Sequence, residues 1–156
     1  MTESIWFTDA LMRIHVAPED TDGAYALIEA LAPSGHMPPP HIHDRDAEGF
    51  FVLEGEVTLY SAAGERVLRP GQGAHLPGGE PHTFRVTSTE PARMLLISTP
   101  AGFAGFAGFV RAVGRPAESE TLPVLDGPPD VDAFAAAAEQ HGITFVGPPG
   151  AVPAGV

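Results

Sequence analysis

The sequence predicts an all-β fold, an antiparallel sandwich or barrel, followed by a helical C-terminal third. Its 156 residues favour one domain, and a hydrophobic share of 44% is enough for a buried core. The 18 Gly and 17 Pro residues suit a fold with many turns. Between Ala10 and Thr99, short apolar or alternating runs are separated by turn residues, which is typical of many short strands.

Eight segments of this region have the length and composition of strands. They are Ala10–Val16, Tyr25–Leu31, Gly49–Leu53, Val57–Ser61, Arg66–Leu68, Gly73–Leu76, His82–Thr87 and Arg93–Ser98. Turn sequences such as Asp22-Gly23, Glu54-Gly55 and Pro70-Gly71 separate them. Because Gly or Pro interrupts every window of helical length here, we expect no helix before Thr99.

The last third of the chain predicts two helices joined by an extended linker. The first is expected where aromatic side chains recur at helical spacing: Phe103, Phe106 and Phe109. Gly114 would end that helix, and we expect its aromatic stripe to pack on the outer surface of the barrel, with a lid over the barrel mouth as the alternative. Asp130–Gln140 is Ala-rich and starts with acidic residues, which predicts the second helix. The Pro- and Gly-rich stretch Arg115–Pro129 would link the two.

Composition excludes several classes of function. The net charge is −12 and all 8 basic residues are Arg, so binding to nucleic acid or to an anionic membrane is not expected. The absence of Cys excludes disulfides, thiolate nucleophiles and iron–sulfur clusters, and the absence of Lys excludes Schiff-base chemistry. No apolar run approaches the ~20 residues that span a bilayer, and the N-terminus lacks the pattern of a signal peptide. We therefore expect a cytoplasmic protein.

Three histidines and one glutamate form the chemical signal of the sequence. His41 and His43 are two residues apart, so both point to the same face of a strand. The stiff segment Met37-Pro38-Pro39-Pro40 precedes them, a short turn would bring Glu48 back toward them, and His82 begins another predicted strand. This set suits one divalent transition metal (Fe, Mn, Ni, Co, Cu or Zn) and would leave coordination positions open. The alternative is that these histidines make only ordinary hydrogen bonds.

The expected surroundings of this cluster are apolar. Phe50 and Val52 share the strand parity of Glu48, while Phe84 and Val86 share that of His82, so all four are candidates to line a substrate pocket. Simple core filling is the alternative. His36 is a further candidate for the pocket, where it would act as an acid or base. The alternative is that it is an exposed histidine of a loop.

Two motifs of this region resemble those of the cupin superfamily. The first motif (35–55) reads Gly35, five residues, His41-Ile42-His43, four residues, Glu48, six residues, Gly55. The second (71–86) reads Gly71, five residues, Pro77-Gly78-Gly79, two residues, His82. One departure is that Val86 stands where the second motif often has Asn, which leaves the metal ligands untouched.

The resemblance implies a cupin-type double-stranded β-helix, or jelly-roll barrel, with one or two C-terminal helices. It implies a β-barrel over 1–100, a helical and Pro-rich extension over 101–156 that packs on the barrel, and a homodimer. His41, His43, Glu48 and His82 would be the metal ligands. Glu48 would also be catalytic, since in some cupin dioxygenases the glutamate accepts a proton from the substrate.

A similarity to small quercetin 2,3-dioxygenase-like cupins gives the leading functional hypothesis. It is a metal-dependent dioxygenase that acts on a small aromatic or enolisable substrate. The first alternative is a non-catalytic cupin that binds a small molecule or metal as a sensor or accessory protein. A sugar isomerase or epimerase ranks last, since it would need further acid–base residues.

Overall fold

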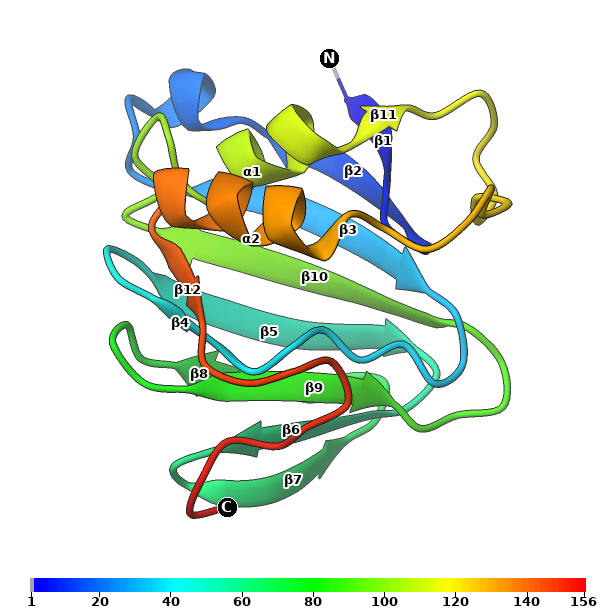
Figure 1. Ribbon diagram of the computed structural model, residues 1–156, viewed down its shortest axis with the longest axis vertical. Helices are drawn as coiled ribbons and strands as arrows, with labels where there is room; N and C mark the ends of the chain where they lie inside the picture. Colours follow the sequence, from blue (N-terminus) through cyan, green and yellow to red (C-terminus); the bar gives the residue numbers. More distant parts are fainter. Residues whose placement is uncertain (1) are drawn as a thin grey trace.

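Two antiparallel β-sheets packed face to face form the body of the protein in the computed structural model, which describes residues 2–156 (Figure 1). The larger sheet has seven strands in the order β11-β1-β2-β3-β10-β5-β8, and the smaller has five in the order β12-β4-β9-β6-β7. The result is the predicted jelly-roll barrel, with two helices after it.

The larger sheet is built around β10, which pairs with β3 on one side and β5 on the other. Its strands are β1 (Glu3–Phe7), β2 (Ala10–Val16), β3 (Ala26–Ala32), β5 (Ala47–Glu54), β8 (Gly73–Leu76), β10 (Ala92–Thr99) and β11 (Arg115–Pro116). Pairing places Met12 beside Ala30, Ala30 beside Met94, and Met94 beside Val52, all of them buried. This row belongs to the face that the sheet turns toward the core.

The smaller sheet joins the middle of the chain to its C-terminal part. Its strands are β4 (His41–His43), β6 (Val57–Ser61), β7 (Gly64–Leu68), β9 (His82–Val86) and β12 (Ile143–Phe145). Strand β4 pairs with β9 at His41 and His82, and β12 pairs along the whole of β4. A one-turn 3-10 helix, Pro18–Thr21, connects β2 toward β3.

Helices α1 (Phe106–Val113) and α2 (Val131–Gln140) cover the inner face of β1 and its neighbours in the larger sheet (Figure 1). The ring of Phe7, on the inner face of β1, lies 5.2 Å from that of Phe109 and 5.8 Å from that of Phe134, centroid to centroid. The expectation that the aromatic stripe packs outside the barrel is therefore wrong. Phe103, which is 68% exposed, lies before α1 and takes no part in this packing.

The sequence prediction missed three strands, and all three lie at or near the edge of a sheet. Strand β1 begins with polar residues, while β11 and β12 contain two and three residues. Strand β11 pairs with β1 and β12 pairs with β4, so both contacts join segments far apart in sequence. Segments this short have no periodicity to read, and only their partners make them strands. The C-terminal extension thus adds a strand to each sheet.

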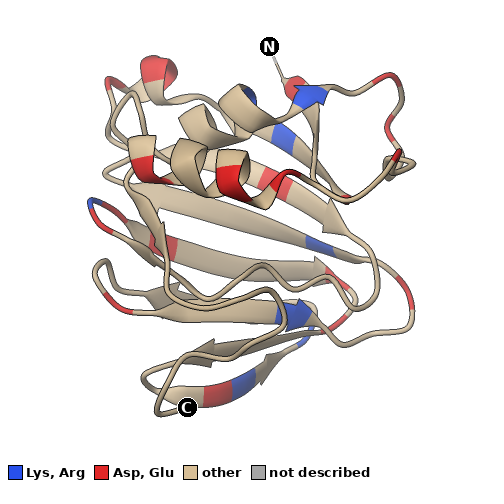
Figure 2. Cartoon of the chain, in the orientation of Figure 1, with Lys and Arg blue, Asp and Glu red and all other residues tan. Residues whose placement is uncertain are grey.

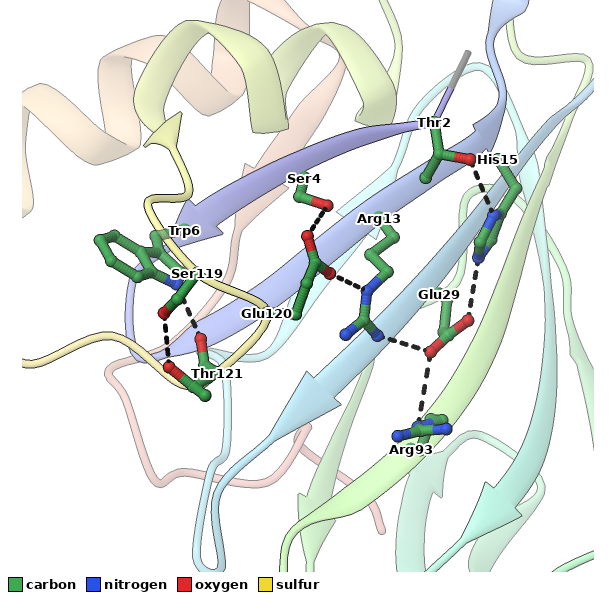
Figure 3. A network of polar contacts seen from close by, with 10 residues as sticks. All are labelled: Thr2, Ser4, Trp6, Arg13, His15, Glu29, Arg93, Ser119, Glu120 and Thr121. Atoms are coloured by element: carbon green, nitrogen blue, oxygen red, sulfur yellow. Dashed lines mark hydrogen bonds and ion pairs between the residues drawn. The ribbon is translucent and has the colours of Figure 1, made fainter.

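Polar side chains fasten the linker between the helices to the outer face of the larger sheet (Figure 3). The Glu120 carboxylate accepts hydrogen bonds from Arg13 Nε (2.6 Å) and Ser4 Oγ (2.8 Å), and Trp6 Nε1 donates to the Thr121 carbonyl (2.8 Å). Arg13 also pairs with Glu29 at 2.7 Å. These contacts fix the place from which the linker continues toward α2.

Charged side chains are scattered over the molecule. Acidic residues lie on several loops, on α2 and in both sheets, and the Arg residues lie apart from one another in the view of Figure 2. In residues 2–156, none of the helices has the length and hydrophobicity needed to cross a membrane.

Candidate metal centre and its cavity

Three histidines and one glutamate meet where the two sheets face each other. The side chains of His41, His43, Glu48 and His82 each offer one ligand atom, and these four atoms lie within 4.8 Å of one another. Glu48 comes from β5 of the larger sheet, and the histidines come from β4 and β9 of the smaller one. The structure therefore brings together the four residues that the sequence analysis assigned to a metal.

Backbone packing holds these strands in place. His41 and His82 are direct partners in the β4–β9 ladder, and the Gly79 amide donates to the His43 carbonyl at 2.9 Å. A Cβ atom on Gly78 would lie 2.6 Å from the Asp46 carbonyl oxygen, so this turn accepts only glycine at its closest approach. The turn before β9 is thereby packed against the loop after β4.

Each of the three imidazole rings is oriented by a hydrogen bond at Nδ1. The acceptors are the Pro39 carbonyl for His41 (2.8 Å), the Asp46 carboxylate for His43 (3.2 Å) and the Glu80 carbonyl for His82 (3.2 Å). With Nδ1 bonded in this way, Nε2 is the nitrogen of each ring that is left for a metal. The Nε2 atoms of His82 and His43 lie 3.2 Å and 3.8 Å from Glu48 Oε2, so the potential ligand atoms gather around one point.

The site is buried, and its protonation states follow from that burial. His43, Glu48 and His82 are 2%, 6% and 3% exposed. Burial would raise the pKa of Glu48, but the hydrogen bond with His82 and the nearby imidazoles lower it to about 2. Burial, together with His82 and His43, lowers the pKa of His41 to about 3. At neutral pH the site therefore contains an ionised carboxylate and a neutral His41, as metal ligation requires.

The pKa of His43 moves the other way. Burial would lower it, but the hydrogen bond to Asp46 and the carboxylate of Glu48 raise it above the ordinary value. Asp46 is itself buried and was not assigned a role from the sequence, where it is one of several polar residues in a connection. A carboxylate behind a ligating imidazole fixes the ring and increases its basicity as a ligand.

The donor set fits a divalent transition metal. Three neutral imidazoles and one carboxylate would leave a divalent ion with a net charge near +1, and four ligands leave positions open in a six-coordinate arrangement. Imidazole and carboxylate together suit several first-row ions, so the donors do not select one metal.

A cavity of about 1150 Å³ leads to the cluster. Of the four residues, His41 and Glu48 line it and His43 and His82 do not. Aromatic side chains make up much of the remaining wall: Trp6, Phe7, Phe84, Phe106, Phe109, Phe134 and Phe145. The metal centre therefore opens toward an apolar space that is large enough for a small organic molecule.

The five residues predicted to line a substrate pocket divide into two groups. His36 and Phe84 line the cavity. Phe50, Val52 and Val86 are buried in the core and do not line it, which is the core-filling alternative. Strand parity places them on the inner face correctly, and the ring of Phe50 packs against that of Phe84, 5.1 Å away.

The sequence analysis missed most of the cavity wall. Phe7 comes from β1, Phe106 and Phe109 from α1, Phe134 from α2 and Phe145 from β12. The ring of Phe106 lies 6.1 Å from that of His43, so the first helix reaches the metal centre itself. The helical spacing of the phenylalanines was the available signal, although it predicts one apolar face and not the surface that the face covers.

Comparison with known proteins agrees with this architecture. Residues 27–98 match the Cupin_2 family, described as a cupin domain. Over 115 residues, or 74% of the chain, the sequence is 31% identical to quercetin 2,3-dioxygenase of Bacillus subtilis (strain 168). The match covers 33% of that protein, so the chain spans about one third of the length of the curated relative.

Solved structures show the same fold. Ectoine synthase from P. lautus superimposes with a TM-score of 0.56 at 22% identity, covering 83% of this chain and 88% of that chain. A polyketide cyclase from Streptomyces resistomycificus gives a TM-score of 0.53 at 22% identity, covering 64% of this chain and 73% of that chain. The same barrel therefore supports several different reactions.

Proposed function

The chain belongs to the cupin superfamily, and from that membership we propose that it is a metal-dependent dioxygenase acting on a small aromatic or enolisable substrate. One observation carries the proposal: three pre-oriented imidazoles and a buried carboxylate open into a large aromatic cavity. The likeness to a quercetin 2,3-dioxygenase supports the reaction type.

The four ligands would hold a divalent transition metal, which supplies Lewis acidity toward an ionised hydroxyl and a redox centre for dioxygen. Asp46 and the carbonyls of Pro39 and Glu80 keep the imidazoles in place through Nδ1. The aromatic wall binds the rings of the substrate and excludes water from the centre.

Glu48 is the proposed catalytic base. It faces the cavity and is ionised at neutral pH, so its position and charge would let it accept a proton from a substrate hydroxyl or an enolisable carbon.

The composition of the cavity wall argues against one of the two alternative functions. A sugar substrate would need many hydrogen-bonding groups, whereas aromatic and aliphatic side chains supply much of this wall. A sugar isomerase or epimerase is thus disfavoured. A non-catalytic binding protein would use the same centre and cavity, so an activity measurement is needed to separate it from a dioxygenase.

Oxygen consumption tests the proposal. The protein is freed of metal, reloaded separately with Fe²⁺, Mn²⁺, Ni²⁺, Co²⁺, Cu²⁺ or Zn²⁺, and supplied with flavonols, diketones and catechols in an oxygen electrode. We expect substrate-dependent oxygen uptake with at least one redox-active metal, lost in Glu48→Gln and retained in Glu65→Gln, an exposed residue of β7. Tight binding of a substrate without uptake under every metal would instead establish a binding protein. The homodimer stays a prediction that sedimentation of the purified protein tests.

A further inference from the structure

A second polar group faces the cavity at a distance from the metal centre. His36 and Asp9 both line the cavity, and the Nδ1 atom of His36 lies 2.6 Å from Asp9 Oδ1. The His36 side chain is 9% exposed, and its ring lies 5.5 Å from that of Phe84. His36 therefore sits in the cavity wall, whereas the Asp9 side chain is 35% exposed at its edge.

The carboxylate decides which ring nitrogen is free. Burial would raise the pKa of Asp9, but its hydrogen bond with His36 lowers it, so the carboxylate is ionised and acts as an acceptor. His36 Nδ1 is then the donor, and in the neutral ring Nε2 is the acceptor. Within residues 2–156 no protein group pairs with this Nε2 atom. In the same part of the chain, the one fully buried side-chain nitrogen or oxygen that lacks a hydrogen bond is Arg93 Nε. His36 Nε2, which also lacks one, is therefore not fully buried.

Strand β9 runs past both His36 and the metal centre, so its length sets the scale of the distance between them. The Val86 amide donates to the His36 carbonyl at 3.0 Å, while His82, four residues earlier on the strand, pairs with His41. At the rise of an extended strand, the backbone positions of Val86 and His82 lie about 13 Å apart, which gives the scale of the distance. Phe84 is midway between them on the same face and presents its ring to the cavity.

We propose that the cavity binds a planar, hydroxylated aromatic molecule of two or three rings that spans this distance. One end lies at the metal centre beside His41 and Glu48, the rings pack on Phe84, and a hydroxyl at the far end donates a hydrogen bond to His36 Nε2. The inference rests on the proposed function, because it takes the metal centre as the place of reaction. His36 is thus a residue that determines specificity, and Asp9 positions it.

A purely structural role for the pair is the competing explanation. The hydrogen bond ties the segment after β3 to the turn between β1 and β2, and that tie alone would account for the contact. A structural tie would affect all ligands equally. An anchor for a hydroxyl affects only ligands that have that hydroxyl, so paired ligands separate the two roles.

Ligand binding to Zn²⁺-loaded protein without oxygen is the test. Trp6, the one tryptophan of the chain, lines the cavity, so its fluorescence reports binding. We would compare 3-hydroxyflavone with its 7-hydroxy and 4′-hydroxy derivatives in the wild type and in His36→Phe. At least one derivative is expected to bind the wild type on the order of tenfold more tightly than the parent compound, and His36→Phe is expected to lose that preference. His75→Phe, on the exposed edge strand β8, is the matched control that keeps it.

An equal preference in the wild type and His36→Phe would overturn the anchor, as would the absence of any preference in the wild type. Should His36→Phe not fold, ¹⁵N spectra of the wild-type imidazoles give the same answer. The Nε2 resonance of His36 is expected to shift with the preferred derivative and not with its parent; no difference would overturn the proposal. The binding test contains no oxygen, so a preference that depends on His36 supports the anchor even if the oxygen electrode shows no turnover. Turnover without that preference would support the dioxygenase and overturn the anchor.

Discussion

The metal centre and the wall of its cavity are built from different parts of the chain. The four ligands lie on three strands within residues 41–82, at spacings that local turns fix. The aromatic wall is assembled from both ends of the chain, with Phe7 in β1 and Phe109, Phe134 and Phe145 in the C-terminal extension. The candidate ligands are thus encoded locally, whereas the aromatic surface in front of them depends on long-range packing.

This difference predicts that variants of the two regions fail in different ways. A change at a ligand should remove metal and leave the aromatic packing intact. A change in the wall should alter stability and ligand binding and leave the metal in place. The predictions below run from the largest expected effect to the smallest.

Replacing a ligand has the largest effect. In His82→Gln the cluster loses an imidazole whose Nε2 lies 3.2 Å from Glu48, so we expect the metal-to-protein ratio after gel filtration to fall close to zero and oxygen uptake to be lost. Elemental analysis measures the ratio. Full metal content in His82→Gln would contradict the assignment of this ligand. His75→Gln provides the matched control, because His75 is an exposed histidine of the neighbouring β8.

Truncating the wall at its most buried aromatic residue lowers stability instead. Phe109 is 3% exposed and contacts the rings of Phe7 and Phe134, so Phe109→Ala is expected to lower the free energy of unfolding by about 3–5 kcal/mol. Urea denaturation measures this loss, and metal content measured on the folded variant should stay at the wild-type ratio. Loss of metal in folded Phe109→Ala would break the proposed separation of the two regions. Phe103→Ala, at an exposed ring, is the control that changes neither quantity.

Acid should destabilise the metal-free protein by protonating His41 and Glu48. The pKa of His41 falls from 6.5 to about 3 on folding and that of Glu48 from 4.5 to about 2, so the unfolded chain binds these protons first as the pH drops. Both groups therefore contribute stability above their unfolded pKa values that is lost as the pH falls from about 6.5 toward 2. His43, whose pKa is raised, acts in the opposite sense and offsets part of the loss. Denaturation of chelator-treated protein at a series of pH values tests this, and a flatter profile is expected in His41→Gln.

The residue behind His43 has a smaller effect on metal affinity. Asp46→Ala removes the acceptor of the His43 Nδ1 hydrogen bond, so we expect metal affinity to fall about 10- to 100-fold with the four ligands intact. Competition with a chromophoric chelator measures the affinity. Asp44→Ala, at a neighbouring exposed carboxylate, should bind metal like the wild type. Equal affinity in Asp46→Ala would show that the carboxylate does not support the ligand.

The smallest effect is expected at the outer face of the larger sheet. Glu120→Gln removes the charge of an exposed carboxylate that pairs with Arg13 at 2.6 Å (Figure 3). Exposed ion pairs contribute little, and salt screens them, so stability and metal content should stay near wild-type values. A large change in the metal-to-protein ratio would show that the linker governs the centre, against the separation of the two regions.

The same separation explains what the sequence could predict. His41, His43, Glu48 and His82 follow fixed spacings on alternating strands, so their convergence was predictable from a local pattern and a family resemblance. The pairing of β12 with β4 and the packing of Phe7 on Phe109 join residues about a hundred positions apart, which periodicity cannot report. Strand parity gave the inner face for Val52 and Val86, but it does not distinguish a core side chain from one that lines a cavity.

The absorption spectrum of Co²⁺-loaded protein tests most directly whether the metal centre opens into the aromatic cavity. Titration with 3-hydroxyflavone without oxygen is followed in the visible bands of the cobalt ion and in the fluorescence of Trp6, which lines the cavity. We predict that both signals change together and saturate at the same ligand concentration. Cobalt bands that stay unchanged while Trp6 reports a saturated cavity would contradict the account.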